Sequence, residues 1–242
     1  MAPPTIVLLH GFTQTGRSWE PTVAALGERY RALAPDLRGH GSAATARPVD
    51  VASVQADVLA LAPERFALAG YSMGGRIALA LALDPAARGR VERLTLIGAS
   101  PGLGDPEERR ARRASDEALA ARIERDGIRA FAREWAALPL WSGQPPAVAA
   151  AADAVRLRQE PAGLAAALRG LGTGAMQPLW ERLPELTLPV TLVAGERDAK
   201  FRAIAERMAA ALPDATLRVV PGAGHAVQLE APQAVARALA AR

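Results

Sequence analysis

The sequence predicts a doubly wound α/β fold, in which helices cover both faces of a mostly parallel β-sheet. Short apolar runs that end in Gly, Asp or Ser alternate along the chain with longer segments of helical character. The apolar runs do not alternate apolar with polar residues, so they are interpreted as strands buried on both faces. The chain has 242 residues, half of them hydrophobic, which suits one such fold with an insertion.

The first 62 residues contain two strand–helix pairs. TIVLLHG (5–11) is an unbroken apolar run ended by glycine, and WEPTVAALGERY (19–30) is the helix expected after it. YRALAPD (30–36) is the second predicted strand, and VASVQADVLALA (51–62) is its helix. The repeated strand–helix order favours parallel neighbours in one sheet.

The third pair is the most compact in the sequence. RFALAGYS (65–72) is a predicted strand that passes within two residues into the predicted helix GGRIALALALD (74–84). VERLTLIGAS (91–100) is the fourth predicted strand. The pattern then stops, because residues 101–184 contain no strand-like run and are rich in Ala, Arg, Leu and Trp. A structureless loop of this length is unusual, so a helical cap insertion is predicted there.

The remaining elements restore the alternation. PVTLVAGERD (189–198) and ATLRVVPGAGH (215–225) are predicted strands, followed by the predicted helices 201–212 and 231–242. The chain is therefore divided into a core, residues 1–100 and 185–242, and the insertion, residues 101–184. GLGTG (170–174) resembles part of a nucleotide-binding loop, but no strand precedes it, so a turn between helices is favoured.

Composition narrows the classes of function. The absence of cysteine excludes disulfides, thiolate metal sites and cysteine nucleophiles. The formal charge is +4, but only 4% of residues are aromatic, which argues against nucleic-acid binding. The N-terminal apolar run is too short to span a membrane and lacks a basic flank, so a soluble, cytoplasmic protein is expected. No His/Asp/Glu cluster has metal-ligand spacing, so neither a metal nor a cofactor is predicted.

Ser72 is the predicted nucleophile or base of a Ser–His–Asp triad. It stands in GYSMG, a G-x-S-x-G motif between a predicted strand and a predicted helix, where small neighbours permit a strained turn. Asp198 and His225 follow the last two predicted strands, and the order Ser, Asp, His suits this type of fold. Each residue alone has a simpler explanation: a serine in a Gly-rich turn, a helix cap at Asp198 and a loop histidine.

The first strand is followed by His10-Gly11-Phe12, where an oxyanion-hole amide is expected. We assign the two donors to the backbone N–H groups of Phe12 and Met73. His10 is predicted to brace this loop. His40 is predicted to stabilise the loop after the second strand.

Arg76 is a cation on an otherwise apolar helix, one turn beyond Ser72. An unpaired buried charge is strongly unfavourable, so Arg76 requires either an acidic side chain of the protein or an anionic ligand. Both explanations remain open at the level of the sequence. In the run ERRARRASDE, Arg109, Arg112 and Arg113 are predicted to share one helix face, with Arg110 turned aside; such a run is ordinarily a solvated surface.

Several motifs resemble a known family. LLHGF, PDLRGHG, GYSMGGR, GERD and PGAGH are similar to the α/β-hydrolase fold proteins. More narrowly, the chain resembles the MenH-type 2-succinyl-6-hydroxy-2,4-cyclohexadiene-1-carboxylate synthases of menaquinone biosynthesis. This narrower resemblance covers nearly the whole chain and depends on five stretches: GYSMGGRIAL, SPGLGDPEERRARRASDEALA, FAREWAALPLW, GLGTGAMQPLW and GERDAKFRAIA.

The resemblance implies a lyase that removes a proton beside a carbonyl and expels pyruvate, with Ser72 acting as a base rather than as an acyl acceptor. It implies a small polycarboxylate substrate, for which Arg76 and Arg112 are expected to hold carboxylates. Trp135 is expected to pack over the substrate, although ordinary core packing explains it as well. Tyr71, whose hydroxyl could donate to a carboxylate or simply pack, and Lys200, the single lysine, are further candidate substrate contacts.

Two other functions remain as alternatives. A carboxylic-ester hydrolase would use the same triad through an acyl-enzyme. A ligand receptor on the same fold would not need an intact triad. The cationic positions favour the lyase over an esterase with an apolar acyl pocket. No membrane insertion is expected, and the sequence leaves open a monomer or a small homo-oligomer.

Overall fold

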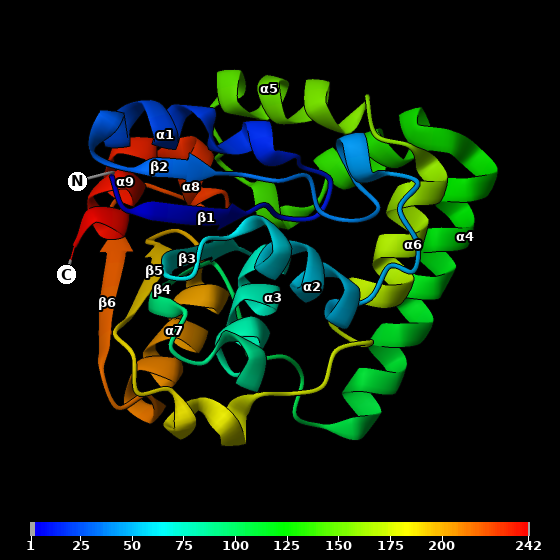
Figure 1. The fold of residues 1–242 in the computed structure, drawn as a ribbon. Coiled ribbons are helices and arrows are strands. Elements are labelled where there is room, and N and C mark those ends of the chain that lie inside the picture. Colours follow the sequence, from blue (N-terminus) through cyan, green and yellow to red (C-terminus); the bar gives the residue numbers. More distant parts are fainter. Residues whose placement is uncertain (1–2, 242) are drawn as a thin grey trace.

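Six parallel strands form the central sheet, in the order β2-β1-β3-β4-β5-β6. The computed structural model describes residues 3–241. The doubly wound α/β prediction is confirmed, with every strand pair parallel (Figure 1). The strands are β1 Thr5–Leu9, β2 Arg31–Leu33, β3 Phe66–Tyr71, β4 Val91–Ile97, β5 Val190–Gly195 and β6 Ala215–Val220.

Strand order reverses between β1 and β3, because β2 lies on one side of β1 and all later strands lie on the other. Loops that leave the carboxyl ends of strands at such a reversal diverge and open a crevice. The loop after β1 carries Phe12, and the turn after β3 carries Ser72. The topology therefore brings the predicted oxyanion loop and the predicted nucleophile to one place.

Helices cover both faces of the sheet (Figure 1). One face packs against α1 Glu20–Leu26, α8 Val227–Glu230 and α9 Pro232–Ala240; the other packs against α2 Val51–Leu61, α3 Met73–Ala82 and α7 Ala199–Ala211. Alternate residues of β1 enter the two layers: Ile6 and Leu8 face α1 and α9, whereas Val7 and Leu9 face α3. Both layers are apolar, which explains why the strands show no polar alternation.

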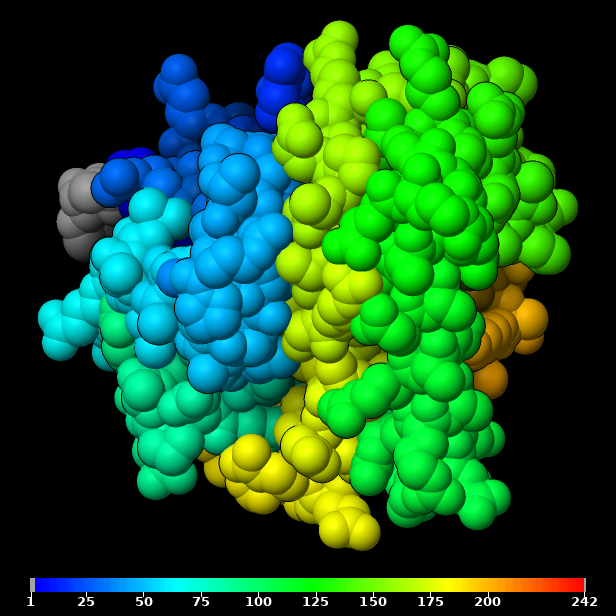
Figure 2. Space-filling view, turned by 90° about the vertical axis from the view of Figure 1, so that its right-hand side faces the viewer, coloured from blue at the N-terminus to red at the C-terminus, as the bar shows by residue number. Residues whose placement is uncertain are grey.

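The helical insertion lies between β4 and β5, as predicted, and contains α4 Pro106–Ala136, α5 Pro146–Arg156 and α6 Pro161–Leu171. Figure 2 shows green α4 running beside yellow-green α6 on one face of the molecule. Arg169 of α6 binds Glu117 and Glu124 of α4, with its Nη atoms 2.8 and 2.7 Å from their carboxylate oxygens. Gly127 interrupts α4 with φ 77° and ψ 173°, a conformation suited to glycine, and kinks the helix.

An apolar cluster joins the insertion to the core. It contains Ala120, Ile123, Phe131, Leu164, Ala165 and Leu168, and the partly buried Phe12 and Trp135 pack against it. The ring of Phe12 lies 5.3 Å from that of Trp135 and 6.1 Å from that of Phe131, centroid to centroid. The loop after β1 therefore supports the insertion with its side chain.

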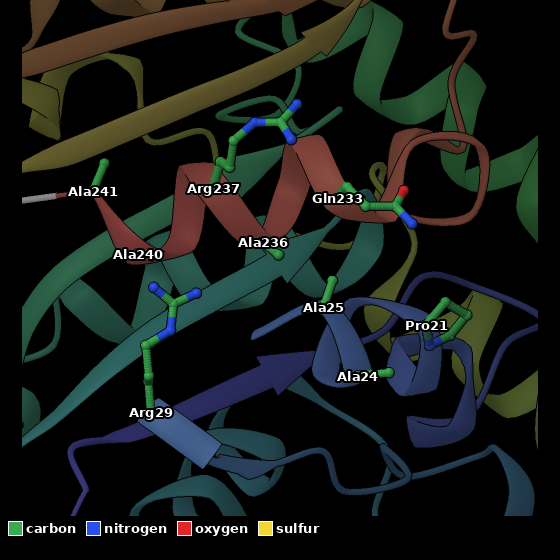
Figure 3. A pocket seen from close by; sticks show the side chains of 9 residues that line it. All are labelled: Pro21, Ala24, Ala25, Arg29, Gln233, Ala236, Arg237, Ala240 and Ala241. Atoms are coloured by element: carbon green, nitrogen blue, oxygen red, sulfur yellow. The ribbon is translucent and has the colours of Figure 1, made fainter. Parts of the chain in front are cut away.

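An open groove of about 650 Å³ lies between α1 and α9 (Figure 3). Alanine side chains such as Ala25 and Ala236 line it, together with Arg29, Gln233 and Arg237. None of the predicted site residues lines this groove. Within residues 3–241, no helix combines the length and the apolar character that a membrane span requires.

Candidate active site

Ser72 occupies a strained turn between β3 and α3. Its backbone has φ 51° and ψ −109°, in a region that residues other than glycine rarely adopt. Two backbone hydrogen bonds fix it: its N–H donates to the Ile97 carbonyl at 2.9 Å, and its carbonyl accepts from Arg76 N at 3.1 Å. The turn presents the hydroxyl above the carboxyl edge of the sheet, as the nucleophile-elbow motif predicts.

Glycines on either side make this turn sterically feasible. A Cβ on Gly70 would lie 2.5 Å from the Gly74 carbonyl carbon, and a Cβ on Gly74 would lie 2.5 Å from the His10 carbonyl oxygen. Real Cβ atoms do not approach backbone so closely. The small residues of the motif therefore let β3, α3 and the loop after β1 meet at one point.

His225 connects the other two predicted triad members. Its Nδ1 lies 2.6 Å from Asp198 Oδ2, and its Nε2 lies 3.3 Å from Ser72 Oγ. His225 and Asp198 are both buried. Asp198 also caps α7, because its Oδ1 accepts a hydrogen bond from Phe201 N at 3.3 Å. The Asp198 carboxylate therefore contacts His225 with one oxygen and caps α7 with the other.

The backbone amides of Phe12 and Met73 are candidates for an oxyanion hole beside Ser72. Among residues 3–241, neither Phe12 N nor Met73 N has a backbone acceptor, and Met73 is the first residue of α3. Gly11 allows the loop after β1 to approach, since a Cβ there would lie 2.6 Å from the Tyr71 ring. The helix N-terminus adds a partial positive charge at the same place.

His10 and His40 are fully buried behind the oxyanion loop. His10 Nδ1 lies 2.8 Å from the Gly11 carbonyl, and its Nε2 accepts from Leu37 N at 2.9 Å, which links the loops after β1 and β2. Burial lowers the pKa of His10 to about 4 and, together with the neighbouring His10, lowers the pKa of His40 to about 3. Both imidazoles are therefore neutral at pH 7 and serve as loop braces.

A cavity of about 310 Å³ opens over Ser72. All predicted site residues except Asp198 line this cavity, and Asp198 lies behind His225. The lining residues among them are Phe12, Tyr71, Ser72, Met73, Arg76, Arg112, Trp135, Lys200 and His225. The insertion supplies Arg112 and Trp135, together with Leu140 and Trp141. The cavity thus lies between the sheet edge and the insertion.

Arg76 has no carboxylate within ion-pair distance among the described residues. Its Nη2 donates to the Leu171 carbonyl at 2.7 Å, and its Nε lies 3.5 Å from Met176 Sδ. Burial, and then the nearby Arg112, lower the pKa of Arg76 to about 10, so it stays charged at neutral pH. The nearby Asp116 acts on Arg76 only through its charge and raises the pKa, so no direct ion pair forms among the described residues, and a carboxylate ligand for Arg76 stays a prediction.

Arg112 is held by Asp116, whose Oδ1 accepts from Arg112 Nε at 2.8 Å. The Asp116 side chain is 6% exposed, and its Oδ2 is buried without a partner. Because Nε is the bonded atom, the two Nη atoms of Arg112 remain available as a fork toward the cavity. Sequence reasoning missed Asp116, although its spacing of four residues from Arg112 was a usable signal.

The predicted arginine face is wrong in one respect. Arg110 lies with Arg109 and Arg113 around a separate concavity formed with residues 174–177, whereas Arg112 turns to the catalytic side. Helix geometry explains this, because residues 109, 110 and 113 lie within about 100° of one another around the helix axis and residue 112 lies outside that arc. The loop at Gly174 also approaches the helix closely, since a Cβ there would lie 2.5 Å from Arg113 N. This loop packs against the α4 backbone and lines the separate concavity.

The other three predicted contacts differ in their surroundings. Tyr71 is buried in the layer under α1 and α9, and its hydroxyl has no hydrogen-bond partner; burial raises the pKa of this phenol, which stays protonated. Trp135 Nε1 is also buried without a partner. The Lys200 Nζ lies 5.8 Å from the Phe201 ring centroid. Their roles as substrate contacts remain predictions.

Two aromatic residues that the sequence did not single out surround the imidazole. The Phe201 ring centroid lies 4.4 Å, and that of Trp141 5.8 Å, from the centroid of His225. Phe201 follows Asp198 at the start of α7, and Trp141 comes from the insertion. They limit the access of water to the His225 ring, and no sequence motif marks that proximity.

Comparisons with known proteins agree with this geometry. The model of the Alpha/beta hydrolase family matches residues 6–238. A putative 2-succinyl-6-hydroxy-2,4-cyclohexadiene-1-carboxylate synthase of Bacillus subtilis is 37% identical over 96% of this chain and 87% of its own length. The synthase of that name from Klebsiella pneumoniae is 35% identical over 98% and 92%.

Solved structures give the same picture. The structure of MenH from S. aureus superposes with a TM-score of 0.91 and 30% identity, covering 97% of this chain and 91% of that one. A thermophilic esterase from Thermogutta terrifontis superposes with a TM-score of 0.81 and 27% identity, over 98% and 88%.

Proposed function

The chain belongs to the alpha/beta hydrolase family and, within it, to the 2-succinyl-6-hydroxy-2,4-cyclohexadiene-1-carboxylate synthases, and from this premise we propose its reaction. It eliminates pyruvate from 2-succinyl-5-enolpyruvyl-6-hydroxy-3-cyclohexene-1-carboxylate and forms the cyclohexadiene product of menaquinone biosynthesis. It is therefore a carbon–oxygen lyase that acts on a small molecule.

The names of substrate and product fix the electron movement. A base removes the proton from ring C2, beside the succinyl carbonyl. Those electrons form the C2=C3 bond, the former C3=C4 pair becomes C4=C5, and the C5–O bond breaks. The enolpyruvyl group leaves as the enolate of pyruvate and takes up a proton, so no water or redox partner is consumed.

Ser72 is the proposed base, activated through His225. The 3.3 Å distance between Ser72 Oγ and His225 Nε2 is long for a hydrogen bond, as is common before substrate binds. Asp198, 2.6 Å from Nδ1, orients the imidazole and stabilises its protonated form once the proton has moved. The amides of Phe12 and Met73 then donate to the succinyl carbonyl oxygen as it gains enolate charge, a contribution of about 3 kcal/mol per donor.

The observation that carries the proposal is the charge of the cavity. The substrate has three carboxylates, on the ring, the succinyl group and the enolpyruvyl group. The cavity offers three cations, Arg76, Arg112 and Lys200, and Arg76 has no carboxylate partner among residues 3–241. An ester hydrolase uses the same triad, but a neutral ester does not require a partly buried arginine without a carboxylate partner.

The test is a paired assay on purified protein. Pyruvate release from the cyclohexene substrate is expected, and Ser72→Ala is expected to reduce kcat by about 10²- to 10⁴-fold, the range for a lost general base. A simple aryl ester is run in parallel with both proteins. Rapid ester hydrolysis that is lost in Ser72→Ala, without any pyruvate release, would overturn the proposed lyase function in favour of a hydrolase.

A further inference from the structure

Arg197 lies one residue before Asp198 and connects three separate segments. Its Nη2 donates to Glu230 Oε2 at 2.9 Å, and its Nη1 donates to the Gly143 carbonyl at 2.5 Å. Glu230 ends α8, and Gly143 lies between residues 139–141 and α5 of the insertion. One guanidinium therefore binds the core and the insertion at the same time.

Glu230 is a buried carboxylate that also holds the loop of His225. Its side chain is 4% exposed, and Oε2 accepts from Gly224 N at 2.8 Å, directly before His225. The backbone of Arg197 adds a further tie, since Arg197 N donates to the Ala223 carbonyl at 3.0 Å. The Arg197–Glu230 ion pair thus holds the loop that carries His225 against the loop that carries Asp198.

The Gly143 carbonyl accepts the hydrogen bond from Nη1, the other terminal nitrogen of the Arg197 guanidinium. Gly143 has φ 72°, and a Cβ there would overlap Arg197 Nη1. Two residues earlier, Trp141 packs on His225, and Leu140 and Trp141 line the cavity. The position of this wall over the imidazole is therefore fixed through the guanidinium of Arg197.

We propose that Arg197 is a positioning residue that places the cavity wall at residues 140–141 and the His225 loop relative to one another. The inference rests on the proposed function for its substrate. A misplacement of a supporting group by about 1 Å can change a rate by up to about 10²-fold. Loss of the guanidinium leaves Glu230 buried without its cation and releases the insertion, so both sides of the contact loosen.

The experiment uses three single variants, the double variant Arg197→Gln/Gly143→Ala and the conservative variant Arg197→Lys, with two readouts. Arg197→Gln breaks both contacts, Gly143→Ala disturbs the contact from the insertion side, and Arg65→Gln, which removes an exposed ion pair with Glu92, is the matched control. The first readout is KM and kcat for pyruvate release. The second is the rate of Ser72 sulfonylation by phenylmethylsulfonyl fluoride, which reports the triad independently of the lyase substrate. Thermal melting confirms that each variant is folded.

Arg197→Gln is expected to raise KM and to slow sulfonylation, each by about fivefold or more. Gly143→Ala is expected to raise KM similarly while sulfonylation stays within about twofold of the unmodified protein. The double variant should have a KM no higher than the worse single variant, because both act through one contact. Arg197→Lys, which keeps the charge but cannot fork, should recover part of the sulfonylation rate.

The proposal would be overturned if Arg197→Gln had the same KM and the same sulfonylation rate as the control Arg65→Gln. KM effects that multiply in the double variant would also overturn it, since Arg197 and Gly143 would then act separately. If the unmodified protein releases no pyruvate, the proposed function fails, while the sulfonylation rates still decide whether Arg197 braces the triad.

Discussion

Arg76 is a partly buried cation whose hydrogen-bonding partners in the protein are neutral: the carbonyl oxygen of Leu171 and the sulfur of Met176. Desolvation of a charge is unfavourable, and these two groups offset it only in part. The shift of the Arg76 pKa to about 10 has the same cause. A bound carboxylate would supply the missing countercharge and accept two parallel hydrogen bonds from the fork.

Replacing Arg76 tests this arrangement. Arg76→Ala is expected to reduce kcat/KM for the tricarboxylate about 10- to 100-fold, because a hydrogen bond to a charged group contributes about 1.5–3 kcal/mol. Steady-state kinetics of pyruvate release measure the loss, and sulfonylation of Ser72 by the neutral sulfonyl fluoride should change little. Arg113→Ala, in the outer concavity, is the control. Equal losses in both reactions would show that Arg76 is structural.

The His10–His40 pair predicts a pH effect on stability. Both folded-state pKa values, about 4 and about 3, lie below the ordinary histidine value of 6.5. The neutral forms therefore stabilise the fold above pH 6.5, and this contribution is lost as pH falls toward 4, because the unfolded chain binds protons first. Between pH 7 and pH 5 the free energy of unfolding should fall by about 2 kcal/mol per histidine.

Urea unfolding of the unmodified protein and of His40→Gln, at pH 7 and pH 5, measures this effect. The variant should lose about 2 kcal/mol less between the two pH values, since one titrating group is gone. Asp36 and His10 lie within electrostatic reach of His40, and neither titrates between pH 5 and pH 7 in the folded protein, because the pKa of Asp36 is lowered and that of His10 is about 4. Identical pH dependence in the two proteins would contradict a buried, neutral His40.

At the scale of elements, α4 carries most of the contacts that the insertion makes with the cavity. Its first half presents Arg112 and its second half presents Trp135, and the kink at Gly127 sets the angle between them. A straight helix would not bring both side chains to the cavity while packing along α6. The glycine conformation is therefore tied to the shape of the site.

Gly127→Ala should lower the free energy of unfolding by about 1–3 kcal/mol, because alanine at φ 77° and ψ 173° is strained although no atom blocks its Cβ. It should also raise KM, since the angle between the two halves of α4 changes. Chemical denaturation and steady-state kinetics measure the two effects. Gly104→Ala, at an open position without positive φ, is the control. An unchanged stability would show that α4 tolerates the bend without glycine.

Much of the element pattern was predictable, because each strand is apolar on both faces and each helix follows its strand. The boundaries of the elements were less predictable. The second predicted strand covered residues 30–36, but only Arg31–Leu33 pair with β1. The insertion was predicted as helical without element limits, since its charged surface helices have no strand alternation to mark them. The division into a core and an insertion as domains stays a prediction.

Residue positions followed the same logic. Ser72, Asp198 and His225 could be predicted because each follows a strand, and parallel strands end at one edge. The surroundings of Arg76 and the proximity of Trp141 to His225 could not, because they join segments at least 84 residues apart through packing. Such contacts leave no periodic signal in a single sequence.

At the scale of the molecule, cations from both parts of the chain meet in one cavity. Arg76 and Lys200 come from the core, and Arg112 comes from the insertion. The whole chain has a formal charge of +4. A cleft of one sign with low-dielectric walls concentrates ions of the opposite sign and speeds their association.

This charge predicts a salt dependence. Raising ionic strength from 0.05 to 0.5 M should lower kcat/KM for the trianionic substrate several-fold, because the Debye length falls from over ~10 Å to under ~5 Å. Arg112→Gln should show a shallower slope. The control reaction is sulfonylation of Ser72 by the neutral reagent, whose rate should not follow salt. A salt-independent kcat/KM would exclude electrostatic steering.

Phe12 has two roles that bear on how such proteins can be recombined. Its backbone N–H is a proposed donor to the reacting oxygen, whereas its ring packs against Phe131 and Trp135 of the insertion. The insertion is thus not an exchangeable module. A chimera that receives the insertion of a relative must also receive a matching side chain at position 12, or the new contact will shift the amide on which the chemistry depends. Substrate range and catalytic geometry are expected to diverge together in this lineage.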